Sequence, residues 1–334
     1  MSDGRPPSAG VGSRTPGPGP RAPLLGLRID VDTHEGMKRG VPALLDLLRE
    51  ASVKATFYLS MGPDNAGKAI FNVLRRPGFL GKMRRTGAAR VYGLRTVLSG
   101  TLLPARLIAA ALPGIARRVT AEGHEAGVHA WDHRRWQDKL PRLSDNEVAS
   151  QLGRARQAFI DIFGEPPRTF AAPAWFGDER SLQVEEWYAL EYASDCRGVE
   201  PFLPVVGGKA LATPQVPTTL PTLDEALGDT HHDARAFYDS MLDAAASAAW
   251  PVLTVHAELE GGPYAGDLRR FLRRAAERGI RPAPLGELLA ARRADGRPLP
   301  ERRMGYGTVP GRHGTVFMPV AGDTLPVATP PAHP

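Results

Sequence analysis

Three histidines fall within the stretch EGHEAGVHAWDHRRW, which covers residues 122–136. They are His124, His129 and His133, and three residues separate the last two. Imidazole is a common ligand of Zn²⁺ and similar divalent ions, but a catalytic metal site also needs a ligand or two from elsewhere in the chain. Spacing alone is therefore compatible with a metal site, with surface histidines or with packing by chance.

Carboxylates that complete such a site occur in RIDVDT, residues 28–33, which contains Asp30 and Asp32. One of the two can join His129 and His133 around a metal ion, and the other can take a proton from water. His256, in the stretch VLTVHAE, can protonate a leaving amine. A metal, a base and an acid together predict a metal-assisted amide hydrolase.

The elements that position these residues alternate along the chain. Strand patterns occur at 24–31, 54–60, 125–130, 168–173 and 251–258, and helical patterns occur at 40–51, 144–164 and 264–279. Repeated strand–helix alternation predicts an α/β fold with a parallel sheet or barrel. Catalytic groups of such folds lie at the carboxyl ends of strands. Asp30, Asp32, His129 and His256 all stand at or near predicted strand ends.

The chain has 334 residues, of which 42% are hydrophobic and 23% are charged, as in ordinary globular proteins. We expect a disordered tail over 1–23, because Pro, Gly, Ser and Arg dominate it. A catalytic domain is expected over 24–292 and a C-terminal tail over 293–334. Cys196 is the only cysteine, which excludes an internal disulfide. We expect neither a secretory signal nor a membrane-spanning helix, since no long apolar run occurs.

The stretch 65–121 has eleven Lys or Arg residues and no Asp or Glu. Bulky apolar residues lie between the cations, a pattern typical of segments that lie on an anionic membrane surface. An ordinary basic surface insertion is the alternative. Binding to nucleic acid is not expected, because no nucleic-acid-binding motif accompanies the charge. We therefore predict a basic amphipathic insertion that faces an anionic membrane.

The motifs RIDVDT, ATFYLSMGP, EGHEAGVHAWDHRRW and VLTVHAE resemble, in this order, those of the polysaccharide deacetylase family. The resemblance covers residues 24–290 and implies a distorted (β/α) barrel that holds a divalent metal ion, with Zn, Mn and Co not distinguished. It implies that Asp30 is the catalytic base and His256 the catalytic acid. The implied metal ligands are Asp32, His129 and His133. His124 corresponds to a structural histidine that often precedes the metal pair in the family.

A narrower set of motifs, GLRIDVDT, GPDN, HAWDH, SDCRG, VPTTLPTLDE and HAELEG, resembles the 4-deoxy-4-formamido-L-arabinose-phosphoundecaprenol deformylases. The resemblance implies removal of formate from an amino sugar linked to a polyprenyl phosphate. It implies a peripheral protein on the cytoplasmic face of the inner membrane, acting in the lipid A aminoarabinose modification and polymyxin resistance. The alternatives are an N-deacetylase of peptidoglycan or another polysaccharide, and a non-catalytic glycolipid-binding barrel. The oligomeric state stays open.

The third motif, FAAPAWFGDER, departs from the family pattern. It has no arginine before Pro173, where the family has an arginine that holds the catalytic aspartate; Arg180 and Arg197 are the candidates to replace it. Trp175 is expected either to line the sugar pocket or to pack in the core. By the same resemblance, Asp195 is expected to orient His256.

Overall fold

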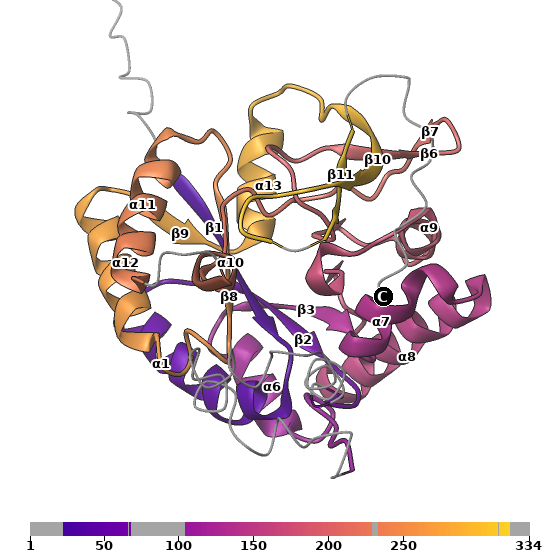
Figure 1. The fold of residues 1–334 in the computed structure, drawn as a ribbon, viewed down its shortest axis with the longest axis horizontal. Coiled ribbons are helices and arrows are strands. Elements are labelled where there is room, and N and C mark those ends of the chain that lie inside the picture. Colours follow the sequence, from indigo (N-terminus) through magenta and orange to yellow (C-terminus); the bar gives the residue numbers. More distant parts are fainter. Residues whose placement is uncertain (1–22, 66, 68–103, 229–232, 313, 321–334) are drawn as a thin grey trace, which may run out of the picture.

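The computed structural model describes residues 23–65, 67, 104–228, 233–312 and 314–320. A sheet of seven parallel strands forms its centre (Figure 1), in the order β5-β4-β3-β2-β1-β8, with β9 paired to β1. The strands are β1 (Leu24–Val31), β2 (Thr56–Ser60), β3 (Glu125–Ala130), β4 (Thr169–Phe170), β5 (Tyr192–Ala193), β8 (Val252–His256) and β9 (Arg281–Ala283). The predicted α/β fold with a parallel sheet is confirmed.

Most helices cover the outer side of the sheet (Figure 1), whereas α13 (Leu285–Ala294) packs on the other face, where Leu285 and Leu288 approach Gly26 of β1. The other long helices are α1 (Val41–Glu50), α6 (Pro113–Ala121), α8 (Asp145–Phe163), α9 (Glu179–Trp187), α11 (Ala234–Ser247) and α12 (Ala265–Glu277). The sequence marks the ends of α8 clearly. Ser144 and Glu147 form a capping box at its start, and Gly164 ends it with a φ of 80°, a left-handed conformation that suits glycine.

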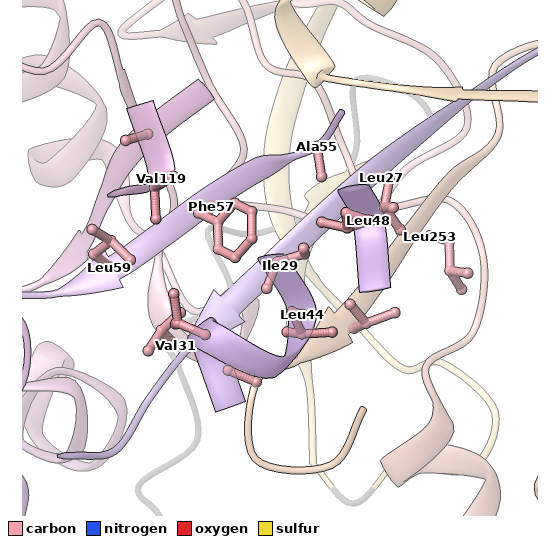
Figure 2. Close-up of a cluster of buried hydrophobic side chains, with 14 of the residues drawn as sticks. Leu27, Ile29, Val31, Leu44, Leu48, Ala55, Phe57, Leu59, Val119 and Leu253 are labelled. Carbon is pink, nitrogen blue, oxygen red and sulfur yellow. The ribbon is translucent and has the colours of Figure 1, made fainter. Parts of the chain in front are cut away.

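The largest core cluster lies between the sheet and the helices on its outer side. Figure 2 shows Leu27 and Ile29 of β1 beside Leu44 and Leu48 of α1, and all four side chains are completely buried. Side chains alternate between the two faces of a strand. Because the odd-numbered residues of β1 face α1, Arg28 and Asp30 share the opposite, interior face. The apolar packing of β1 thus fixes where this arginine and this carboxylate lie.

A second, four-stranded sheet has the order β11-β10-β6-β7. Its strands are β6 (Leu203–Val206), β7 (Lys209–Ala210), β10 (Glu301–Gly307) and β11 (Val316–Pro319). Residues 301–319, expected within a C-terminal tail, therefore supply two strands. The sequence of β10, ERRMGYG, has charges and glycines in place of apolar alternation. Its pairing with β6 joins segments almost one hundred residues apart, so no local pattern reveals it.

The basic stretch 65–121 lies mostly outside the described residues, as do residues 1–22. Three of its cations belong to the described end, and each has an ordinary protein partner. Arg106 lies 3.1 Å from Glu35, Arg117 donates to the Ile162 carbonyl at 2.7 Å, and Arg118 lies 2.8 Å from Glu122. In the described part of the chain, every helix is too short or too polar to cross a bilayer.

Candidate active site

Two histidines and one carboxylate meet at the carboxyl ends of β1 and β3. Asp32 follows β1, His129 stands near the end of β3, and His133 begins the short helix α7 (His133–Lys139). The Oδ1 atom of Asp32 lies 3.3 Å from Nε2 of His129 and 3.5 Å from Nε2 of His133. One ligand atom from each residue falls within 4.8 Å of the others. The structure thus brings together the three predicted metal ligands.

The hydrogen bonds of this cluster fit a cation. The Nδ1 atom of His129 lies 2.8 Å from the Ala171 carbonyl oxygen, which can only accept, so Nδ1 carries a proton and Nε2 faces Oδ1 of Asp32. Oδ1 of Asp32 is buried without a hydrogen-bond partner among the described residues. Burial lowers the pKa of His129, but Asp30 and Asp32 outweigh this effect and raise it. A positive charge is therefore favoured between Nε2 and Oδ1, either as a proton on Nε2 or as a metal ion held by both atoms. Burial lowers the pKa of His133 to about 4, so this imidazole is neutral, as a ligand must be.

Asp30 is held by an arginine of its own strand. The Nε and Nη2 atoms of Arg28 donate to the two carboxylate oxygens of Asp30 at 2.7 and 2.8 Å, and both side chains are buried. Burial raises the pKa of Asp30. The positive charges of Arg28, His129 and His256 outweigh this effect, so the pKa lies below its ordinary value. Asp30 is therefore an ionised carboxylate at neutral pH.

Arg28 holds Asp30 in place of the arginine that the third motif lacks. Sequence reasoning overlooked this residue. The two candidates named from sequence hold other groups: Arg180 donates to Asp178 and to the Leu140 carbonyl at 2.8 Å, and Arg197 donates to Glu225 at 2.7 Å. Neither replaces the missing residue. The signal was the spacing of Arg28 and Asp30, because two residues apart on a strand lie on the same face.

His256 ends β8, beside Asp30 in the register of the sheet. Its amide donates to Glu260 at 2.8 Å, and its Nδ1 atom lies 3.6 Å from Oδ1 of Asp224, a residue of α10 (Leu223–Gly228). Burial lowers the pKa of His256, but Asp224 foremost and then Asp32 and Asp30 raise it to about 9. The imidazole is therefore protonated at neutral pH.

The prediction that Asp195 orients His256 needs correction. The two oxygens of Asp195 accept hydrogen bonds from the Ala172 amide and from the Gln215 side chain, both at 2.7 Å. Asp195 is completely buried and stabilises the interior, where isolated bridges join residues 193 and 197 to 215 and 218. The acid that faces His256 is Asp224, which belongs to the motif VPTTLPTLDE.

Comparison with known proteins agrees with this geometry. A family model described as polysaccharide deacetylase matches residues 26–193. The chain belongs to the polysaccharide deacetylase family. Proteins of this family hydrolyse linear amide C–N bonds, and this chain is a hydrolase of that class.

Two curated relatives cover most of the chain, and both are named as probable 4-deoxy-4-formamido-L-arabinose-phosphoundecaprenol deformylases. The relative from Shewanella sediminis is 36% identical over 265 residues, which are 79% of this chain and 85% of that protein. The relative from Wigglesworthia glossinidia brevipalpis is 31% identical over 284 residues, which are 84% and 97% of the two chains. A polysaccharide deacetylase structure described as putative, from Mycobacterium smegmatis, superposes with a TM-score of 0.58 at 18% identity and covers 85% of this chain and 95% of that one. The distorted barrel expected of the family is confirmed.

A glutamate of the HAELEG motif was also missed by sequence reasoning. Oε1 of Glu258 accepts hydrogen bonds from the Asp32 amide at 3.1 Å, the Thr33 amide at 2.8 Å and the Thr33 hydroxyl at 2.7 Å. A Cβ atom at Gly36 would lie 2.0 Å from this oxygen, so only glycine permits the approach. Glu258 thus fixes the loop that carries Asp32. Burial and Asp32 raise the pKa of Glu258 to about 7.

Trp175 and His124 pack inside the protein. Trp175 is 2% exposed, and its indole nitrogen donates to Thr218 at 3.0 Å, so it lies in the core beside the site. His124 accepts from the Ala55 amide at 3.2 Å and packs against the Phe57 ring. It precedes β3, at the opposite end of that strand from His129. The three histidines of the family motif therefore divide into a pair at the site and one in the structural core.

Proposed function

We propose that the protein is a metal-dependent deformylase that removes formate from 4-deoxy-4-formamido-L-arabinose linked to undecaprenyl phosphate. The observation that carries this proposal is the meeting of three groups at one end of the sheet. They are the Asp32 cluster, the ionised Asp30 and the protonated His256. The amide hydrolase chemistry follows from the family, and the substrate comes from the names of the two relatives that cover most of the chain.

Asp32, His129 and His133 would hold the divalent ion, through one carboxylate oxygen and two imidazole nitrogens. This ligand set suits Zn²⁺, Mn²⁺ or Co²⁺. When bound, such an ion polarises the amide carbonyl and lowers the pKa of a neighbouring water. Glu258 and the Ala171 carbonyl orient two of the three ligands, as outer partners do in many metal sites.

The proton transfers are assigned to Asp30 and His256. Asp30 accepts a proton from the attacking water, because Arg28 keeps its carboxylate ionised and oriented. His256 donates a proton to the amide nitrogen as the C–N bond breaks, and Asp224 stabilises its charged form. One water is consumed, and formate and a free amine leave.

The proposed setting is the cytoplasmic face of the inner membrane, in the lipid A aminoarabinose modification and polymyxin resistance. The lipid-linked substrate in the relatives' names supports it, as does the basic, acid-free composition of the stretch 65–121. Peripheral binding is tested by sedimentation with vesicles of phosphatidylglycerol or of phosphatidylcholine. Capture by the anionic vesicles alone, weakened by salt, is expected; equal capture by both would contradict the electrostatic role.

The deciding experiment is mass spectrometry of the formamido-arabinosyl polyprenyl phosphate after incubation with the metal-loaded enzyme. Loss of a formyl group with release of formate is the expected result. An N-deacetylase would release acetate from N-acetylated polysaccharide and leave the formamido lipid unchanged. A glycolipid-binding barrel would release neither acid. Either of these results would overturn the proposed substrate.

A further inference from the structure

Three arginines surround the ring of Trp175. The guanidinium carbons of Arg28, Arg197 and Arg312 lie 5.6, 4.9 and 4.8 Å from the centre of the ring. Arg312 comes from the connection between β10 and β11, far beyond residue 193, where the match to the family model ends. The small second sheet therefore brings Arg312 to Trp175, which Arg28 of the active site also contacts.

The charges around this cluster do not balance among the described residues. Arg28 is neutralised by Asp30. Arg197 and Arg312 both lie beside the carboxylate of Glu225, whereas His256 lies beside Asp224. Glu225 lies 2.7 Å from Arg197 and 3.6 Å from Arg312, and Asp224 lies 3.6 Å from His256. Two guanidinium groups therefore share one carboxylate, which leaves one positive charge.

Arg312 carries this excess charge. Its closest polar contact is the Ala174 carbonyl, to which it donates at 3.0 Å, while Glu225 is already bound by Arg197. Burial lowers the pKa of Arg312, though Asp224 and Glu225 oppose this effect. A largely buried guanidinium that shares its acid with another arginine is a strong site for an anion. Its side chain is 17% exposed, so an anion can reach it.

The surrounding backbone holds this cation firmly in place. Gly311, with a φ of 76°, brings the chain close to the carbonyl oxygen of Glu225, where a Cβ atom would lie at 3.0 Å. The face of Trp175 supports the planar guanidinium. Ala174 and Trp175 have φ values of 55° and 52°, a strained left-handed conformation of the kind that clusters at functional sites.

We propose that Arg312 binds the phosphate of the lipid-linked substrate. This inference rests on the proposed function and deepens it. In the substrate of the named relatives, the formamido group and the phosphate stand at opposite ends of one sugar ring. Asp224 and Glu225 are neighbours on α10, and because His256 lies 3.6 Å from Asp224 and Arg312 lies 3.6 Å from Glu225, both cations border the same short helix. A sugar with its amide at His256 would direct its phosphate toward Arg312.

The kinetic test compares two substrates of the metal-loaded enzyme: 4-formamido-arabinose linked to geranyl phosphate, and its uncharged methyl glycoside. We expect Arg312→Gln to lower kcat/KM for the phosphate-linked substrate about tenfold or more relative to the glycoside. The matched control is Arg302→Gln, on β10, because Arg302 is 45% exposed and pairs with Glu200, at 3.4 Å. It should leave the ratio unchanged. Equal losses on both substrates in Arg312→Gln would overturn the proposal.

A binding test separates this inference from the proposed function. Calorimetry with geranyl phosphate should show binding to the wild type and a loss of about tenfold or more in Arg312→Gln. Geraniol reports the contribution of the lipid chain, and inorganic phosphate reports the anion alone. Unchanged affinity of Arg312→Gln for geranyl phosphate would refute the phosphate site. If the wild type binds geranyl phosphate through Arg312 but releases no formate from the lipid-linked substrate, only the deformylase activity is refuted.

Discussion

Replacement of Arg28 by Met tests the arrangement around Asp30 most directly. Arg28 is completely buried and binds both oxygens of Asp30, so its loss leaves a buried carboxylate without its cation. Removal of one partner of a buried ion pair costs about 3–5 kcal/mol. The free energy of unfolding at pH 7 should fall by this amount. At roughly 2 °C for each kcal/mol in a large domain, Tm should fall by about 6–10 °C.

The loss should depend on pH in a defined direction. In the wild type the folded-state pKa of Asp30 is lowered, so its stabilisation is present above the ordinary carboxyl pKa and is lost as pH falls through the lowered value. In R28M burial still raises the pKa, while the largest opposing charge is gone. The deficit of R28M relative to the wild type should therefore be complete at pH 7 and shrink toward pH 4. For the same reason, the acid limb of kcat/KM should move to higher pH.

Urea unfolding at pH 7 and pH 4.5, with pH–rate profiles, measures both effects. The double variant R28M/D30N removes the carboxylate charge as well, so it should recover at least half of the lost stability while staying inactive. Arg180→Met is the matched control, because Arg180 also pairs with an acid, Asp178, but is 28% exposed; it should leave the acid limb in place. If R28M/D30N is no more stable than R28M, the ion-pair reasoning fails.

Three further outcomes are expected. Asp224→Asn should move the alkaline limb of kcat/KM to lower pH, because Asp224 is the foremost group that raises the pKa of His256; an unmoved limb would exclude that role. His129→Ala should lose bound metal by elemental analysis, whereas Asp30→Ala should keep it and release no formate; equal metal content in both would contradict the assigned ligands. Glu258→Gln should weaken metal affinity about 10–100-fold in competition with a chelator, because Glu258 holds the loop of Asp32. Wild-type metal affinity in this variant would show that Glu258 does not position the ligand.

Sequence reasoning could reach the centre of the site because parallel strands bring their carboxyl ends together. Asp32, His129 and His256 are spread over more than two hundred residues, yet each follows or ends a strand with a clear apolar pattern. The order of these strands in the sheet was not needed. It was enough that neighbouring parallel strands share one edge, at which the structure places all three residues.

The residues that position the site were harder to predict. Asp195 follows β5 and Asp224 lies at the start of α10. Both stand in polar stretches, so only the path of the backbone shows which of them reaches His256. Isolated bridges from residues 193 and 197 to 215 and 218 turn Asp195 inward, and the same segment then leads Asp224 to His256. These bridges are single contacts between irregular segments, so they leave no periodic pattern in the sequence. Strand β10 was also missed, because its charges and glycines show no apolar alternation. Strand β11, its partner, was missed with it.

The place of Arg28 links these observations. In β1 the base and its arginine are two residues apart, so the pleat of one strand sets their geometry, and no second segment has to be packed accurately against Asp30. The loop after β4 is thereby free of that task. It carries Ala174 and Trp175 in a strained left-handed backbone and places the indole beside both Arg28 and Arg312. A substitution that relaxes this strain, Ala174→Gly, should therefore disturb the position of Arg312 more than that of Arg28, which its own strand holds.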